Sequence, residues 1–140
     1  HNIANAPVEM LENTYPVTFQ RYSLVPGSGG AGRYRGGCGL ERSFRIDAPA
    51  GTLSLNLDRF KTRPYGIMGG EPGAPGRATL THADGTTEEL PSKLAGKAIR
   101  KGDVFRLITA GGGGYGPPAE RAPDAVAADI ENGYVAGRDR

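Results

Sequence analysis

The chain has 140 residues, of which 17 are basic, 15 acidic, 23 glycine and 11 proline. This near balance of charge gives no strong field to gather nucleic acid or an anionic membrane, which disfavours both as partners. The single cysteine excludes an internal disulfide framework and a multi-cysteine zinc site. We therefore expect one domain spanning residues 1–140, soluble and cytoplasmic, with no membrane span or signal segment.

The first predicted element is a short helix over residues 5–13. Pro7 suits its first helical position, Glu9 places negative charge in its first turn, and Tyr15-Pro16 ends it. Residues 17–25 then alternate apolar and polar side chains, with a slip midway. This pattern predicts a strand that contains a bulge.

Alternation predicts further strands along the middle of the chain. Residues 40–46 place two apolar side chains on one face, and residues 53–58 form the cleanest period-two segment, whose leucines should face a core. Residues 78–82 and 86–90 flank Asp84-Gly85, a pair typical of type I′ hairpin turns. The sequence therefore predicts an antiparallel hairpin there.

The last predicted elements are a strand and a helix. A tight turn at residues 101–103 leads into a strand over 104–109. Residues 123–133 predict a helix that ends at its final glycine and carries Val126 and Ile130 at i and i+4. We expect a mainly β fold: two antiparallel sheets in a sandwich or barrel-like arrangement, with short terminal helices.

Three glycine-rich stretches interrupt this pattern, at residues 27–39, 66–76 and 111–116. They have neither helix nor strand periodicity, so we expect polyproline-II-like segments that pack in one layer with glycines facing one another. Their backbone groups then need partners in adjacent segments, in water or in another subunit. Gly37→Val and Gly113→Val should each cost more than the roughly 1 kcal/mol of a propensity change.

The first glycine stretch invites two binding interpretations. Gly27 to Gly32 resembles a phosphate-binding loop, but Arg33-Tyr34 stands where the Walker pattern needs Lys and Ser or Thr, and no helix can follow. Residues 33–37 resemble an arginine-glycine RNA-binding box, yet they lie between two predicted strands instead of in a disordered tail. Backbone packing accounts for these glycines better than either ligand.

Few residues offer catalytic or metal-binding chemistry. Cys38 lies between glycines, far in sequence from any histidine, and is typical of a small buried thiol. A metal site would have to combine one of the two histidines with hairpin carboxylates. The residues concerned are His1, His82, Asp84, Glu88 and Glu89. We assign no catalytic, cofactor-binding or metal-binding residue to this chain.

A set of motifs, in order along nearly the whole chain, resembles the C-terminal region of the hydantoinase B/oxoprolinase family. The chain departs from the family pattern at Ala6 and at Pro117 or Pro118, so no binding role is assigned there. The motifs are Asn5-Ala-Pro-Val-Glu9, Arg21-Tyr-x-Leu, Gly29-Gly-x-Gly-x-x-Arg-Gly-Gly-x-Gly39, Gly66 to Gly76, Lys93 with Gly102-Asp103, and Thr109-Ala-Gly-Gly-Gly-Gly-Tyr-Gly-Pro117.

The resemblance implies a partner in an ATP-dependent enzyme. The family works with a hydantoinase A-type ATPase subunit in 5-oxoprolinases, N-methylhydantoinases, and acetone and acetophenone carboxylases. As a free chain, the protein resembles the small subunit of acetophenone carboxylase-type enzymes. ATP and a divalent metal are then expected in larger hydantoinase A-type and B-type partner subunits, and no cofactor in this chain.

Two functions follow from the resemblance. The preferred hypothesis is a structural or site-completing subunit, not catalytic alone, of a carboxylase that converts a ketone and bicarbonate to a keto acid. The alternative is a C-terminal fragment of an ATP-dependent hydantoinase/5-oxoprolinase-type amidohydrolase. In either assembly we expect a hetero-oligomer that covers part of the glycine-rich face and the terminal helices, with the basic residues 59–63 as a further polar contact or a solvated loop.

Overall fold

The computed structural model describes residues 5–135. Within them, strands form two antiparallel sheets and a short helix lies near each end, as predicted. The elements in chain order are α1 (Val8–Thr14), β1 (Val17–Leu24), β2 (Leu40–Ile46), β3 (Ala50–Asn56), β4 (Arg77–Thr81), β5 (Thr87–Leu90), β6 (Lys93–Arg100), β7 (Val104–Ile108), a 3₁₀ turn (Pro118–Glu120) and α2 (Pro123–Glu131).

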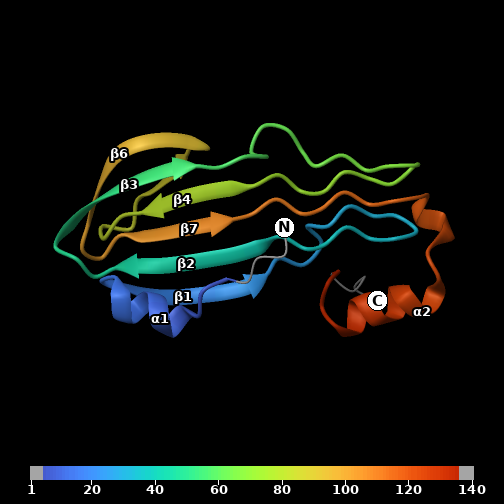
Figure 1. Cartoon of the computed structure of the whole chain (residues 1–140), viewed down its shortest axis with the longest axis horizontal. Coiled ribbons are helices and arrows are strands. Elements are labelled where there is room, and N and C mark those ends of the chain that lie inside the picture. Colours follow the sequence, from blue (N-terminus) through green and yellow to red (C-terminus); the bar gives the residue numbers. More distant parts are fainter. Residues whose placement is uncertain (1–4, 136–140) are drawn as a thin grey trace.

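The larger sheet has the strand order β1-β2-β7-β4-β5, and β3 pairs with β6 in the smaller one (Figure 1). One rung of the larger sheet aligns Phe19, Phe44, Phe105 and Leu80 across four strands. The register of β1 against β2 shifts between Phe19 and Arg21, so the predicted bulge is confirmed.

The core lies between the two sheets. Its buried side chains come from both: Ile46, Ala78, Leu80, Leu90, Ile99 and Phe105. Leu53 and Leu55 of β3 pack against this cluster, which confirms that the leucines of the clean alternating segment face a core. The arrangement is therefore a sandwich, in which a two-stranded sheet covers one face of the five-stranded sheet.

The predicted hairpin forms, but the type I′ turn does not. Gly85 has a φ of +88°, whereas Asp84 is not among the described residues with positive φ. The Asp84 carboxylate instead accepts hydrogen bonds from the Thr86 backbone N–H (2.8 Å) and from its hydroxyl (2.6 Å). A type I′ turn needs positive φ at both central residues, so this side chain's own bonds select a different turn.

The alternation of apolar and polar residues did not predict β6. Its register against β3 shifts between Leu53 and Leu55, and Gly96 in the bulge has a φ of +69°. The Gly96 N–H donates to the Ser54 hydroxyl at 3.2 Å. The small residues that permit this bulge also erase the alternation by which a strand is recognised.

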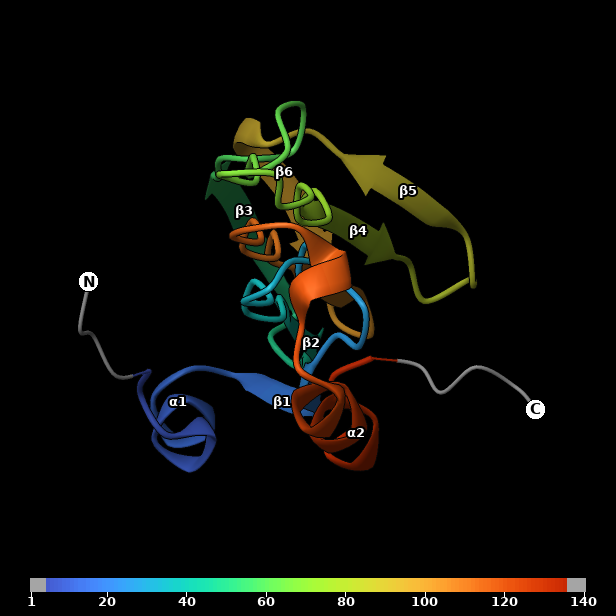
Figure 2. The same cartoon turned by 90° about the vertical axis from the view of Figure 1, so that its right-hand side faces the viewer.

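The two helices flank β1 on the same side of the molecule (Figures 1 and 2). Pro7 is the N-cap of α1 instead of its first helical residue, and α1 has no buried residue. Gly133, with a φ of +69°, follows α2 as the predicted C-terminal stop. No helix in residues 5–135 is long and apolar enough to cross a membrane.

Candidate interaction site

The glycine-rich stretches form a bundle beyond the sheets, which we call the glycine bundle. In Figure 1 the orange segment, residues 109–116, runs between the blue-to-cyan and the green segments. Four outer legs surround it: residues 27–32, 34–39, 64–68 and 70–76. Figure 2 views these segments nearly end-on as a compact group.

The central segment is hydrogen-bonded to all four legs. Each bond joins backbone groups, so the segments hold one another as strands of a sheet would, but in several directions. The bonds run from Gly30 N–H to Gly112 C=O (2.8 Å), from Gly112 N–H to Gly37 C=O (2.9 Å), from Gly114 N–H to Glu71 C=O (2.9 Å) and from Ile67 N–H to Gly114 C=O (2.9 Å).

Glycine is required here because each inward position meets backbone. A Cβ at Gly111 would overlap the carbonyl of Ser28, and one at Gly114 would overlap that of Ala31, on the same leg. The three-residue spacing is that of polyproline II, which has three residues per turn. The polyproline-II-like conformation is therefore confirmed, but a threefold helix has neighbours all round, so the segments form a bundle and not a flat layer.

Gly37 and Gly113, the two glycines for which the sequence predicted close packing, have different surroundings. A Cβ at Gly113 would overlap the carbonyl oxygen of Tyr65, whereas one at Gly37 would meet nothing within 4 Å. The packing expected at Gly113 is confirmed, and that expected at Gly37 is wrong. Gly37 lies on an outer leg with its missing side chain directed to solvent.

Two glycine N–H groups of the phosphate-loop pattern bind carbonyl groups of the chain itself. The Gly27 N–H donates to Tyr134 C=O (2.8 Å) and the Gly30 N–H to Gly112 C=O. Residues 27–32 also open no helix. These residues do not fit a nucleotide phosphate, because a phosphate-binding loop must point its N–H groups at the ligand.

Arginine side chains in this region bind acidic and backbone groups of the chain itself. The carboxylate of Asp129 in α2 lies 3.2 Å from Arg35 Nε and 2.7 Å from Arg121 Nη2. The Arg35 guanidinium also stacks over the Tyr134 ring at 4.9 Å from its centroid. We call Arg35, Arg121 and Asp129 the Asp129 cluster. It holds α2 to the bundle and uses an arginine of the candidate RNA-binding box.

The contacts of α2 are polar, and its apolar side chains are exposed. Asp129, 7% exposed, is the buried residue of the helix. Val126 and Ile130 are 41% and 46% exposed. Cys38 is partly buried, with Sγ 3.5 Å from the carbonyl oxygen of Tyr134, which follows this helix. The i, i+4 apolar pair is therefore available for contact with another surface.

Large apolar side chains also gather at the bundle's far end, away from the sheets. We call them the end patch: Tyr34, Tyr65, Ile67, Met68 and Tyr115, which are 49% to 70% exposed. Tyr34 and Tyr115 exchange two backbone hydrogen bonds of 2.9 Å, and their ring centroids are 6.2 Å apart. Ile67 also forms a β-bridge with Tyr115, so each of the three glycine-rich stretches contributes a side chain to the patch.

A strained turn presents Met68. Met68 has a φ of +52° and Gly69 one of +88°, and the Gly70 N–H donates to Ile67 C=O at 3.0 Å. Positive φ at both central residues is the signature of a type I′ turn. A left-handed residue other than glycine costs roughly 1–2 kcal/mol, and Asn tolerates that conformation better than Met does.

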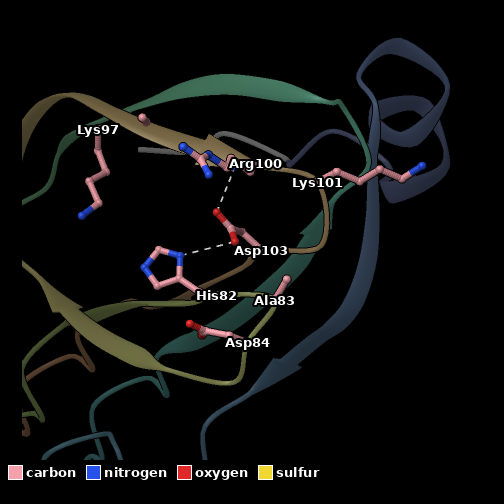
Figure 3. A pocket seen from close by; sticks show the side chains of 8 residues that line it. His82, Ala83, Asp84, Lys97, Arg100, Lys101 and Asp103 are labelled. Carbon is pink, nitrogen blue, oxygen red and sulfur yellow. Dashed lines mark hydrogen bonds and ion pairs between the residues drawn. The ribbon is translucent and has the colours of Figure 1, made fainter.

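A separate polar hollow of about 450 Å³ lies at the opposite end, where the two sheets meet (Figure 3). His82 Nδ1 lies 3.3 Å from Asp103 and its Nε2 3.0 Å from Glu88. Lys97 of β6 binds Glu88 of β5 at 2.6 Å. Figure 3 shows His82 and Asp103 facing each other, while Lys101 points away. The cluster joins strands of both sheets.

The sequence singled out part of this cluster. His82 and Glu88 do come together, with Asp103 and Lys97 as partners that sequence reasoning missed. Asp84 instead binds Thr86, and Glu89 pairs with Arg77. His1 lies outside the described residues. Among residues 5–135, no three His, Cys, Asp or Glu side chains are grouped to hold a metal ion.

The carboxylates near this end are stabilised as anions. A hydrogen bond from Lys97, with a second contribution from His82, lowers the pKa of Glu88 from its ordinary 4.5. The Thr86 hydroxyl lowers the pKa of Asp84 in the same direction. Both carboxylates are therefore held ionised and are poor proton donors: Glu88 ties β5 to β6 through Lys97, and Asp84 fixes the hairpin turn.

A third surface feature is apolar. A hollow of about 510 Å³ opens beside β1, between α1 and the edge of the sandwich. Leu11 of α1, Phe19, Phe44, Leu53 and Ile99 are among its lining residues. In the basic segment 59–63, Arg63 donates to Gly73 C=O at 2.9 Å and Phe60 packs against the core, while Arg59 and Lys61 are exposed.

Known proteins share this arrangement. Residues 1–118 match the family described as hydantoinase B/oxoprolinase. The β subunit of caprolactamase from Pseudomonas jessenii is 33% identical over 138 residues, covering 95% of this chain and 23% of that subunit. The chain thus spans about a quarter of this subunit, and it spans 8% of the 5-oxoprolinase of Saccharomyces cerevisiae, to which it is 37% identical over 109 residues.

Two solved structures have the same fold. The crystal structure of ATP-dependent caprolactamase from P. jessenii superposes with a TM-score of 0.76 at 29% identity, covering 93% of this chain and 23% of that chain. A nucleotide-free structure of acetone carboxylase gives 0.77 at 24% identity, covering 95% of this chain and 22% of that one. The chain belongs to the hydantoinase B/oxoprolinase family.

Proposed function

We propose that this chain is a structural, site-completing module of a hetero-oligomeric, ATP-dependent enzyme. One observation carries the proposal: the segments of the glycine bundle are hydrogen-bonded to one another through their backbones, yet the bundle presents large apolar side chains to solvent. Such a scaffold suits a fixed interface better than a ligand pocket, because exposed apolar patches rimmed by polar residues mark contact surfaces. The related caprolactamase polypeptide is itself named as a β subunit.

The reaction of the whole enzyme is proposed to be the ATP-dependent opening of a cyclic amide. Caprolactamase supports this choice over carboxylation, because its β subunit is 33% identical to this chain. Carboxylation of a ketone with bicarbonate is the second candidate, and the shared fold of acetone carboxylase supports it. In both cases the substrate is activated by partner subunits.

ATP and a divalent metal are proposed to bind those partners, in the cytoplasm. The fit within this chain is poor, since the N–H groups of Gly27 and Gly30 bind carbonyl groups of the chain, residues 27–32 open no helix, and no metal-ligand cluster lies in residues 5–135. The free thiol of Cys38 is in keeping with a reducing compartment. The partner types proposed are larger hydantoinase A-type and B-type chains.

The test is a reconstitution. The tagged chain is purified from its source cells with its partners, and ATP hydrolysis is measured with caprolactam, hydantoin or 5-oxoproline, and separately with acetone or acetophenone plus bicarbonate. We expect cyclic amides to stimulate hydrolysis, and removal of this chain to abolish the stimulation until it is added back. Stimulation by ketones alone would favour the second candidate.

The isolated chain supplies the control. We expect it neither to hydrolyse ATP nor to carboxylate a ketone. Turnover above background, in a preparation shown by mass spectrometry to lack partners, would overturn the proposal of a non-catalytic module.

A further inference from the structure

The end patch is the part of the module that is best organised for contact. Tyr34, Ile67 and Tyr115 come from segments far apart in the sequence, and backbone bonds of 2.9 Å place them side by side. Because the glycines behind them are packed backbone to backbone, the patch cannot relax into the interior. Its side chains stay exposed unless another molecule covers them.

The strain at Met68 is a second, independent observation. A methionine occupies a left-handed position at the apex of a type I′ turn, where Asn or Gly would form the same turn more easily. The side chain is 70% exposed and makes no contribution to the core. Strain that the fold itself does not need is characteristic of residues kept for binding.

We infer that the end patch docks onto an apolar surface of the remaining part of a B-type polypeptide, the region that the relatives carry in addition to this module. This inference rests on the proposed function. The module covers 23% of the caprolactamase β subunit, so most of such a polypeptide lies outside it. Aromatic, methionine and arginine side chains are enriched at protein interfaces, and here the Arg33 guanidinium lies over the Tyr34 ring of the uncharged patch, 5.6 Å from its centroid.

The chain contains its own probe for this contact. It has two methionines, Met10 and Met68, which are 61% and 70% exposed. Met10 belongs to α1 and Met68 to the green segment of residues 64–76, and these two segments extend toward opposite ends of the molecule (Figure 1). In the free chain, dilute hydrogen peroxide should oxidise both at rates within about twofold of each other, because thioether oxidation follows exposure. Peptide mass spectrometry reads each site separately.

The experiment compares the free chain with the complex purified from its source cells, after mass spectrometry has identified a larger B-family chain. We expect oxidation of Met68 to slow by at least about fivefold in the complex, with Met10 reporting the peroxide delivered. Oxidation of Met68 at the free-chain rate would overturn the inference and leave the proposed function standing. Absence of any B-family chain would reject the proposed function, and the inference with it.

A variant separates docking from folding. Met68→Asn suits the left-handed turn, so its thermal midpoint should equal or exceed that of the wild type, while recovery of the complex should fall by about tenfold or more. Met10→Gln on α1 is the matched control and should leave recovery unchanged. Full recovery with Met68→Asn, or a Met68-dependent dimer of this chain in sedimentation, would contradict the inference.

Discussion

The sandwich and the glycine bundle are packed in opposite ways. In the sandwich, side chains such as Leu80, which has no exposed surface, fill the space between two sheets. In the bundle, the backbone is itself the packing surface, and the inward positions have no side chain at all. A side-chain core accepts apolar replacements of similar volume, whereas a backbone core accepts no replacement of an inward glycine.

The largest expected effect tests this difference directly. Gly113→Ala adds one methyl group that would overlap the Tyr65 carbonyl oxygen, so legs of the bundle must separate. We expect a loss of more than about 4 kcal/mol in the free energy of unfolding. Gly37→Ala is the matched control, with no neighbour within 4 Å, and should cost less than about 1 kcal/mol. Equal midpoints in thermal unfolding would show that the bundle is loosely packed.

Truncation of the sandwich core comes next. Leu80→Ala should lower the free energy of unfolding by about 3 kcal/mol, through lost burial and the cavity left behind. Leu24→Ala, at a side chain that is 46% exposed, should cost less than about 1 kcal/mol. Chemical denaturation of both variants provides the comparison. A Leu80 variant as stable as the Leu24 variant would place the core elsewhere.

The Asp129 cluster links the bundle to α2, so its loss should destabilise that helix and leave the sandwich folded. Asp129→Asn removes the charge that Arg35 and Arg121 share, at an expected cost of about 1–3 kcal/mol. Hydrogen exchange over residues 123–131 should accelerate, while the sandwich strands keep their protection. The exposed Asp124→Asn in the same helix serves as control. Exchange that rises equally in the strands would mean that α2 and the sandwich unfold together.

The smallest effect concerns pH and the sandwich alone. The pKa of Glu88 is lowered in the folded chain, so its stabilising contribution is complete above its ordinary 4.5 and is lost as the pH falls through the folded value. The stability difference between wild type and Glu88→Gln should therefore shrink between about pH 7 and pH 3. A difference independent of pH would show that Lys97 and His82 do not lower the pKa of Glu88 in the folded chain.

Local patterns predicted most of the sandwich. The alternating leucines of β3 and the bulge of β1 could be predicted because the polarity of each side chain indicates which face of the sheet it occupies. β6 could not be predicted, since the bulge at Gly96, which has a positive φ, interrupts the alternation of apolar and polar side chains. The type I′ turn was expected at Asp84-Gly85 from composition and occurs at Met68-Gly69, because hydrogen bonds of the Asp84 carboxylate and long-range bundle packing decided the two turns.

The site was less predictable than the fold. Close packing of glycines could be inferred from composition, but no glycine carries a side chain to show which way it faces, and Gly37 and Gly113 look alike in sequence. The end patch and the Asp129 cluster assemble residues more than 45 positions apart, such as Tyr34 with Tyr115 and Arg35 with Asp129. Only the folded arrangement brings them together.

The glycine bundle also changes how stability should respond to temperature. Unfolding of a side-chain core exposes apolar area, which raises the heat capacity, while unfolding of the bundle exposes mainly peptide groups, which lower it. The heat-capacity increment per residue should therefore fall below the usual figure of about 12–15 cal/mol/K. A smaller increment flattens the stability curve, so the chain should lose little of its folding free energy on cooling or moderate warming.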